Sequence, residues 1–277
     1  MPTEKVHLLV DGHVHLYPFM AARTMLDAAS ANFLRSHDVL HDQPASRPPG
    51  GVLLVADPEG TKGFARLAAF RDDRPDRPWS QEHADSANLV FRRSDGAQVA
   101  AVRGQQLVTQ EGLEVLTFGA AVPWAQLPLF TTVDRIAAAG GIAIIPWGAG
   151  KWLGRRGRLV TQLVRASAQR PDILLADNGV RPWCWSRVPQ FEAAAETGVR
   201  LIAGTDPWPI RGEELRAGSY GFRVSLNCRP EGFAMALLRE LRNPAGFFPL
   251  FGRRMSLRRF ASNQVRLTLQ QRQSRQR

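Results

Sequence analysis

The chain has 277 residues, enough for one large domain or two small ones, and its 44% hydrophobic and 22% charged content excludes an intrinsically disordered protein. The formal net charge is +11, but residues 251–277 hold eight arginines and no acidic residue, so the remaining chain carries only +3. Nucleic acid is therefore expected to bind, if at all, only through this C-terminal tail.

Two short apolar runs in the first part of the chain predict buried strands. Residues 6–10 (VHLLV) end at Asp11, and residues 52–56 (VLLVA) end at Asp57. A short apolar run that stops at a turn-forming residue is typical of a strand covered on both faces. The helices predicted after these two strands cover residues 19–40 and 63–70.

A different pattern between residues 88 and 118 predicts a β-hairpin or meander. Short runs rich in Val, Leu and Phe are separated there by Asp95-Gly96 and by the single glycines Gly104 and Gly112. An Asp-Gly pair between strand-forming residues is a strong indication of a hairpin turn.

Beyond residue 118, predicted helices and strands alternate regularly. The helices cover 133–139, 159–169 and 190–197, and the strands cover 142–145, 172–176 and 199–203. Three such units predict a parallel sheet covered by helices, in a layered or barrel-shaped α/β fold. Residues 1–250 are expected to form one domain, because the chain has no internal repeat and no Gly/Ser linker. In the basic tail, residues 251–277, apolar residues at helical spacing predict an amphipathic helix that docks on this domain.

Polar residues that follow the predicted strands form the candidate site, because ligands of α/β folds bind at the carboxyl ends of strands. His13 and His15 follow the first strand. Alternate residues of an extended segment share a face, so two imidazoles can reach one metal ion. Asp206 follows the strand over 199–203. The alternatives are two partly exposed turn histidines and an Asp that caps the next helix or turn.

Three further polar side chains are candidates for the same site. Glu114 alternates with Leu113 and Val115, which sends it either into a polar cavity or to solvent. Asp177 and Asn178 follow the strand over 172–176. They either enter the site, where Asn178 would contact the substrate, or form an Asx-turn.

A basic loop and several tryptophans follow the last strands. Lys151 and Arg155 come after a glycine-rich turn at 148–150, and cations at such a turn suit an anionic substrate such as a phosphate. A solvated basic loop is the alternative. Trp147 and Trp208 are expected to ring the site and contact the substrate, with structural packing as the alternative.

Five segments of the chain resemble the strand-end series of the polymerase and histidinol phosphatase (PHP) superfamily. In chain order they are DGHVHLYP, QEGLEVLTFG, GGIAIIPWG, PDILLADNG and GVRLIAGTDPWP. The resemblance covers roughly residues 6–210, and the His-x-His and Gly-Thr-Asp motifs are also similar to the amidohydrolase superfamily. It implies a distorted seven-stranded (βα)7 barrel of the TIM-like type, with the meander as an insertion and a C-terminal basic helix. It also implies a metal cluster in which His13 and His15 match the opening His-x-His, Glu114 the bridging Glu and Asp206 the Asp of a Gly-Ser-Asp motif.

The chain departs from this family at several positions. The family usually has Thr-Asp-His where this chain has Ala-Asp-Pro at 56–58, and it has a final His where this chain has Trp208. No histidine follows His83 in the sequence. Two histidines remain, together with carboxylates that include Asp57 and Asp177, and these could hold one or two ions.

The resemblance implies a metal-dependent hydrolase. A divalent ion, Zn, Mn or Fe, would activate a water, its pKa lowered towards ~7, for attack on a phosphate ester or a similar anionic substrate. Asp206, Lys151 and Asp177 are the candidate catalytic residues. The missing histidines favour an alternative, a degenerate barrel without catalysis that acts as a binding or regulatory protein.

Cysteine usage and the N-terminus indicate a cytoplasmic location. Cys184 and Cys228 are too few for a disulfide framework, and residues 1–12 lack the apolar run of a signal peptide. No stretch reaches the ~18 apolar residues of a membrane span. The basic loop with Lys151 and Arg155 makes a small anionic substrate the expected partner.

Overall fold

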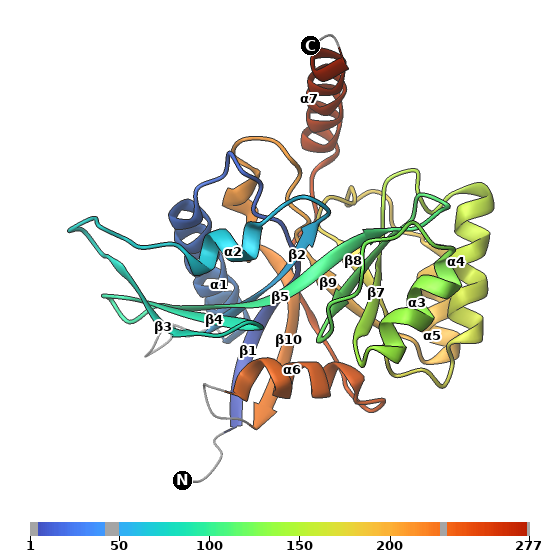
Figure 1. Ribbon diagram of the computed structural model, residues 1–277, viewed down its shortest axis with the longest axis horizontal. Helices are drawn as coiled ribbons and strands as arrows, with labels where there is room; N and C mark the ends of the chain where they lie inside the picture. Colours follow the sequence, from blue (N-terminus) through green and yellow to red (C-terminus); the bar gives the residue numbers. More distant parts are fainter. Residues whose placement is uncertain (1–4, 42–49, 228–231, 276–277) are drawn as a thin grey trace.

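The structure, a computed structural model, describes residues 5–41, 50–227 and 232–275 of the chain. It is a mixed α/β fold built on one eleven-stranded sheet (Figure 1). The strands are β1 (Lys5–Val14), β2 (Gly51–Pro58), β3 (Trp79–Ala84), β4 (Asn88–Arg93), β5 (Gln98–Val108), β6 (Glu114–Phe118), β7 (Ile142–Pro146), β8 (Ile173–Asn178), β9 (Arg200–Gly204), β10 (Tyr220–Asn227) and β11 (Leu250–Gly252). The helices are α1 (Ala22–His41), α2 (Gly63–Ala68), α3 (Leu129–Ala138), α4 (Gly154–Ala166), α5 (Pro189–Thr197), the 3₁₀ turn η1 (Glu213–Arg216), α6 (Phe233–Arg242) and α7 (Leu257–Arg275).

The sheet curls into a nearly closed barrel. Its strand order is β11-β10-β1-β2-β5-β6-β7-β8-β9, and β3 and β4 extend from β5. The end of β9 returns to β1, where the backbone N–H of Asp206 donates to the carbonyl of His13 at 2.8 Å. A Cβ at Gly204 would lie 2.2 Å from the backbone nitrogen of His13. Glycine at position 204 therefore permits the close approach that brings β9 against β1.

The strands β1, β2, β5, β7, β8 and β9 run in the same direction and end at one edge of the barrel, here called the carboxyl end. β1, β2 and β5 are parallel to one another, as are β7, β8 and β9. β6 is antiparallel to both β5 and β7, and β10 is antiparallel to β1. The parallel sheet predicted for the helix–strand units after residue 118 is confirmed for β7, β8 and β9, whereas a hairpin joins β5 to β6 and makes β6 antiparallel. The meander predicted between residues 88 and 118 is confirmed as β4, β5 and β6.

Apolar side chains at alternate strand positions fill the interior of the barrel. They include Val10, Leu54 and Leu174, all fully buried. Leu237 and Leu241 of α6 belong to the same cluster, and α6 lies across the barrel end opposite the carboxyl end (Figure 1). Because an apolar core and a helix close that end, buried polar groups of the interior are confined to the carboxyl end.

Two further apolar layers cover the outside of the barrel. The layer beneath α1 joins its side chains, such as Phe33, to outward-facing residues of β2, such as Leu53. The layer beneath α3, α4 and α5 joins Val133 and Val160 to outward-facing residues such as Leu175. These helices confirm the helices predicted from apolar spacing, with boundaries shifted by a few residues.

The C-terminal helix α7 follows β11 and projects from the carboxyl end (Figure 1). The expected domain boundary between residues 250 and 251 falls inside β11, which pairs with β10. Sheet formation therefore extends through Gly252. Phe260 and Leu267 of α7 pack beside Trp208, while Val265 is 59% exposed, so one face of the helix docks.

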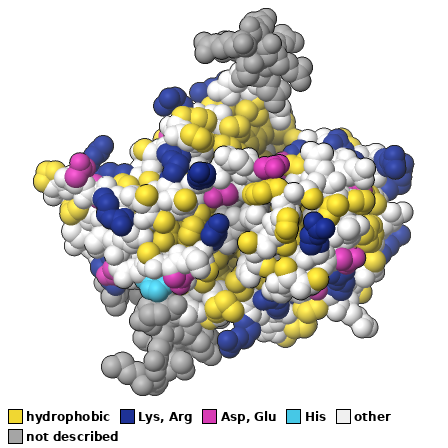
Figure 2. All heavy atoms as spheres, viewed as in Figure 1, with side chains coloured by type: hydrophobic (Ala, Val, Ile, Leu, Met, Phe, Trp, Pro, Cys, Tyr) yellow, Lys and Arg dark blue, Asp and Glu magenta, His cyan; other side chains and the backbone are white. Residues whose placement is uncertain are grey.

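Two further observations concern the surface charges and the length of the helices. Lys and Arg side chains are dispersed among other residues over the described face drawn in Figure 2. None of the helices in the described ranges combines the length and the apolar character needed to cross a membrane.

Candidate metal centre

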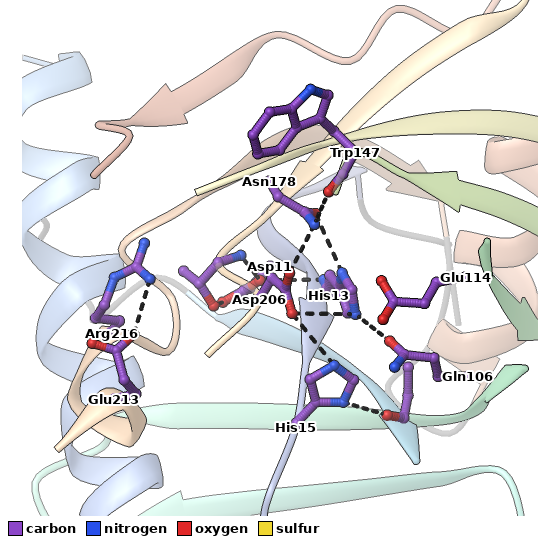
Figure 3. Close-up of polar contacts among 12 residues, drawn as sticks. Asp11, His13, His15, Gln106, Glu114, Trp147, Asn178, Asp206, Glu213 and Arg216 are labelled. Atoms are coloured by element: carbon purple, nitrogen blue, oxygen red, sulfur yellow. Dashed lines mark hydrogen bonds and ion pairs between the residues drawn. The ribbon is translucent and has the colours of Figure 1, made fainter. Parts of the chain in front are cut away.

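A β-bulge near the end of β1 turns two histidines into the barrel. Val10 lies in the interior core and Val14 in an outer layer, although strict alternation would place both on one face. The pairing of β1 with β2 shifts between Asp11 and Val14, where β1 has one extra residue. An extra residue reverses the parity of the strand. His13 and His15 therefore point inwards at the carboxyl end (Figure 3).

His13, His15 and Asp206 form the candidate metal centre. One ligand atom from each lies within 4.8 Å of the others. Oδ1 of Asp206 is 3.7 Å from Nε2 of His13 and 3.5 Å from Nε2 of His15. Donor atoms of a tetrahedral zinc ion with bonds of about 2.0–2.1 Å are roughly 3.4 Å apart. These three side chains therefore fit a single ion.

The protonation of His15 is set by a backbone contact. Its Nδ1 lies 2.6 Å from the carbonyl oxygen of Ala56, which can only accept a hydrogen bond. Nδ1 therefore carries the proton of the neutral ring, and Nε2 presents a lone pair towards Asp206. Metal-binding histidines are typically oriented by such a bond from the other ring nitrogen.

Asn178 sets the protonation of His13 in the same way. Its Nδ2 donates to the carbonyl of Trp147 at 2.6 Å and to Oδ2 of Asp206 at 2.8 Å. These two bonds fix the amide, so its Oδ1 faces Nδ1 of His13 at 3.3 Å. Nδ1 must then be the protonated nitrogen, and Nε2 of His13 carries the lone pair, which faces Asp206 and Gln106 (Figure 3).

Asp206 is held in an unusual backbone conformation. Its φ is +47°, in the left-handed region that residues other than Gly rarely adopt. Such a conformation costs of order 1–3 kcal/mol and persists where the surroundings enforce it. The backbone bond to His13 helps to enforce it here, so the chain accepts local strain where the carboxylate enters the site.

The three side chains attract positive charge to the space between them. Burial raises the pKa of Asp206, but the charge of His13 and the hydrogen bond and charge of His15 outweigh it and hold that pKa well below its usual value. Burial lowers the pKa of His13 more than Asp206 raises it. For His15 the hydrogen bond and charge of Asp206 outweigh burial, so its pKa is raised. A proton on His15 and a metal ion would therefore compete for this space.

Glu114 and Lys151 form an ion pair beside the centre. Glu114 is the first residue of β6, and because β6 is antiparallel to its neighbours, its start lies at the carboxyl end. Its side chain is directed towards His13 (Figure 3). It does not belong to the group of three ligand residues found in the described ranges. The structure therefore places both predicted residues at the site, but pairs the expected metal ligand with a lysine.

Asp57 and Asp177 point out of the barrel, and the structure removes both from the candidate site. Both oxygens of Asp57 accept backbone N–H groups at the start of α2, from Gly63 at 2.9 Å and Phe64 at 3.1 Å. Asp177 accepts from Nε of Arg181 at 2.7 Å and from the hydroxyl of Tyr220 at 2.7 Å. Asp57 is thus a helix cap, and Asp177 is half of a buried ion pair.

Three predicted substrate-binding residues also lie elsewhere. Trp147 is 2% exposed in an outer layer, and Trp208 packs on Phe260 of α7 with ring centroids 5.7 Å apart. Arg155 lines an open depression beside Glu111, at the start of α4. The expected ring of aromatic side chains around the site is therefore replaced by packing.

Gln106 is a site residue that the sequence reasoning missed. Its Oε1 lies 3.1 Å from Nε2 of His13, and its side chain is buried. Gln106 lies within β5 rather than after it, and it is uncharged. Alternation along β5 would have located it, because Val102 and Gly104 face the same interior.

Comparisons with known proteins bear on the fold. No protein-family model matches the chain, and no curated protein matches it in sequence. The crystal structure of PsfC from Pseudomonas syringae PB-5123 is similar, with a TM-score of 0.54 over 96% of this chain and 99% of PsfC. The two sequences are 14% identical, so the likeness concerns the fold alone.

Proposed function

We propose that this protein is a metal-dependent hydrolase of the PHP type that holds one divalent ion, Zn, Mn or Fe, between His13, His15 and Asp206. One observation carries the proposal: hydrogen bonds from the other side of each imidazole leave both Nε2 lone pairs facing a carboxylate oxygen. The strand-end motifs support a variant of the (βα)7 barrel in which the β5–β6 hairpin replaces one helical connection.

The residues around the centre suit hydrolysis. A bound divalent ion lowers the pKa of a coordinated water towards ~7 and so supplies a nucleophile at neutral pH. Asn178 and the carbonyl of Ala56 hold the imidazoles in place, which keeps their lone pairs directed at one point. Glu114, 19% exposed and next to His13, is positioned to accept a proton from the reaction.

Lys151 makes an anionic substrate the best fit. Its side chain is 35% exposed and pairs with Glu114 beside His13, and its charge lowers the pKa of Asp206, so it is positioned to neutralise an anionic group bound at the centre. A phosphate ester is the proposed class, because Lys is a common phosphate-binding residue. Binding of nucleic acid by the tail and a cytoplasmic location stay predictions from the sequence.

Metal analysis of protein purified without a histidine tag tests the proposal. We expect about one Zn, Mn or Fe per chain, a higher Tm on adding the ion, and metal-dependent hydrolysis of p-nitrophenyl phosphate or its diester. The double variant His13→Ala/His15→Ala should lose the metal and at least a thousandfold in turnover. His7→Ala/His83→Ala is the matched control, because these histidines bond Ser225 and Asp85 instead. A wild type that takes up none of the ions and shows no Tm shift overturns the proposal.

The Glu114–Lys151 pair favours one alternative, a barrel that binds a metal and an anion without catalysis. In that case an expected metal ligand is neutralised by a lysine, and the histidines that the resemblance would require are missing. The same experiment separates the two functions. Metal uptake with an anion-dependent Tm shift, but without turnover of phosphate monoesters or diesters, supports the binding protein.

A further inference from the structure

We infer that Gln106 is the fourth protein ligand of the metal centre and binds the ion through its amide oxygen. The inference rests on the proposed metal site. Gln106 is paired in register with Pro58 of β2 and Leu116 of β6, at the carboxyl end of the barrel. Its side chain is 9% exposed, and a polar group buried to that extent requires a partner.

The contact between Gln106 and His13 joins two acceptors. Nε2 of His13 carries a lone pair, because Nδ1 holds the proton that bonds Asn178. Oε1 of Gln106 also carries only lone pairs, yet it lies 3.1 Å from this nitrogen. Two lone pairs at this distance repel each other, so either the Gln106 amide turns its N–H group towards His13 or a cation binds both acceptors. The same spacing is ordinary between two ligands of one ion.

Moving the proton of His13 to Nε2 does not relieve this conflict. Nδ1 would then present its lone pair to Oδ1 of Asn178. Turning the Asn178 amide would in turn direct its oxygen at the carbonyl of Trp147 and at the carboxylate of Asp206. Asn178 is therefore fixed.

Gln106 has no comparable pair of bonds within the described ranges, so its amide can turn. Without an ion its N–H group can donate to Nε2 of His13, and with an ion its oxygen faces the metal. The two amides on opposite sides of one imidazole thus have different roles. Asn178 orients His13, and Gln106 completes the ligand set with the metal.

A fourth protein ligand restricts the choice of metal. Four protein ligands fill a tetrahedral ion such as Zn²⁺ and leave no position for water. An ion that accepts five or six ligands, with a preference for oxygen, keeps open positions. The set of two imidazoles, one carboxylate and one amide oxygen therefore selects Mn²⁺ or Fe²⁺ for a catalytic site.

Metal titrations of variants at position 106 test this inference. Gln106→Leu removes the amide and should weaken Mn²⁺ binding at least tenfold, with a smaller effect on Zn²⁺. Gln106→Glu keeps an oxygen and should bind Mn²⁺ as tightly as the wild type or more tightly. Gln98→Leu on the same strand is the control, because its amide reaches Glu82 on the surface. The visible absorption of Co²⁺-loaded protein should change for Gln106→Leu but not for Gln98→Leu.

The outcomes separate this inference from the proposed function. If Gln106→Leu binds Mn²⁺ like the wild type, with an unchanged Co²⁺ spectrum, Gln106 is not a ligand and the three-residue centre still stands. If Gln106→Glu loses Mn²⁺ as Gln106→Leu does, the amide N–H group matters instead, and the inference is overturned. A wild type that binds none of the ions overturns both. The Tm of each metal-free variant shows whether it is folded.

Discussion

Asp177 and Asn178 are neighbours at the end of β8, yet they belong to different parts of the molecule. Asp177 faces outwards, and its carboxylate is saturated by Arg181 and Tyr220. Asn178 faces inwards, where it connects His13 to Asp206. One step along a strand thus separates a residue that stabilises the fold from a residue that builds a site.

The same difference holds around the carboxyl end. Outward carboxylates such as Asp57 accept hydrogen bonds from backbone donors, whereas Asp206 faces the Nε2 atoms of His13 and His15, which carry lone pairs when the rings are neutral. A saturated polar group contributes stability. Lone pairs that converge without donors favour a bound cation, and this arrangement distinguishes a site from a surface that is merely polar.

Removal of the outward carboxylate of β8 should have the largest effect on stability. Asp177→Ala leaves Arg181 buried without its partner, which should cost about 3–5 kcal/mol of unfolding free energy in urea titrations. Metal affinity should stay within twofold of the wild type. The double variant Asp177→Ala/Arg181→Leu should recover part of the stability, because it removes the unpaired charge. A metal affinity that falls with Asp177→Ala would place Asp177 in the site after all.

Asn178, the inward neighbour of Asp177, should matter more for metal binding than for stability. Asn178→Ala removes the bond that orients His13, and loss of such a supporting partner typically weakens metal binding by about tenfold to hundredfold. Titration with Mn²⁺ or Zn²⁺ measures this effect. Asn88→Ala is the matched control, since Asn88, the first residue of β4, is also buried but bonds Asp85 in the turn between β3 and β4. Equal metal affinities of the two variants would contradict the orienting role.

Glu213 is a further saturated carboxylate and gives a prediction for pH. Burial raises its pKa, but the charge of Arg216 and hydrogen bonds from Asn263 and Arg259 of α7 outweigh burial and lower that pKa. A carboxylate with a lowered folded pKa stabilises the protein above its unfolded pKa, and this contribution is lost as pH falls through the folded value.

Glu213→Gln should therefore cost about 2 kcal/mol at pH 7, and this cost should shrink as pH falls through the folded pKa of Glu213, where the wild-type carboxylate becomes protonated as well. Urea titrations between pH 3 and pH 7 measure the difference, with Glu214→Gln as the control on the same turn. A difference that stays constant over this range would show that the charge of Glu213 is not what holds α7.

Much of the fold could be predicted from the sequence, because the buried strands and their helices carry continuous apolar runs. The sequence patterns predict no helix or strand between residues 211 and 250. β10 there alternates apolar residues with Arg223 and Ser225, so it has no continuous apolar run. The antiparallel direction of β6 follows from its short connection to β5, in agreement with the predicted meander.

The site could be predicted only in part. His13, His15 and Asp206 were found because they follow strands and are typical metal ligands. The prediction that Asp177 belongs to the site is wrong, because alternate residues of a strand face opposite sides of the sheet. Leu174, Ala176 and Asn178 share the inner face, so Asp177 faces outwards. The bulge in β1 depends on pairing with β2 and cannot be seen in the local sequence.

Substitution of Asp57 should have the smallest effect on stability. It also tests most directly whether the face of a strand on which a residue lies decides its role. Its carboxylate caps the six-residue helix α2, so Asp57→Ala should cost about 1 kcal/mol of unfolding free energy. Asp57→Asn keeps one acceptor oxygen and should recover part of that loss. Metal affinity should be unchanged in both variants, because the carboxylate faces away from His13 and His15. If either variant weakened metal binding while the unfolding free energy stayed constant, Asp57 would contribute to the metal centre. The outward direction of a side chain at the end of β2 would then not exclude it from the site.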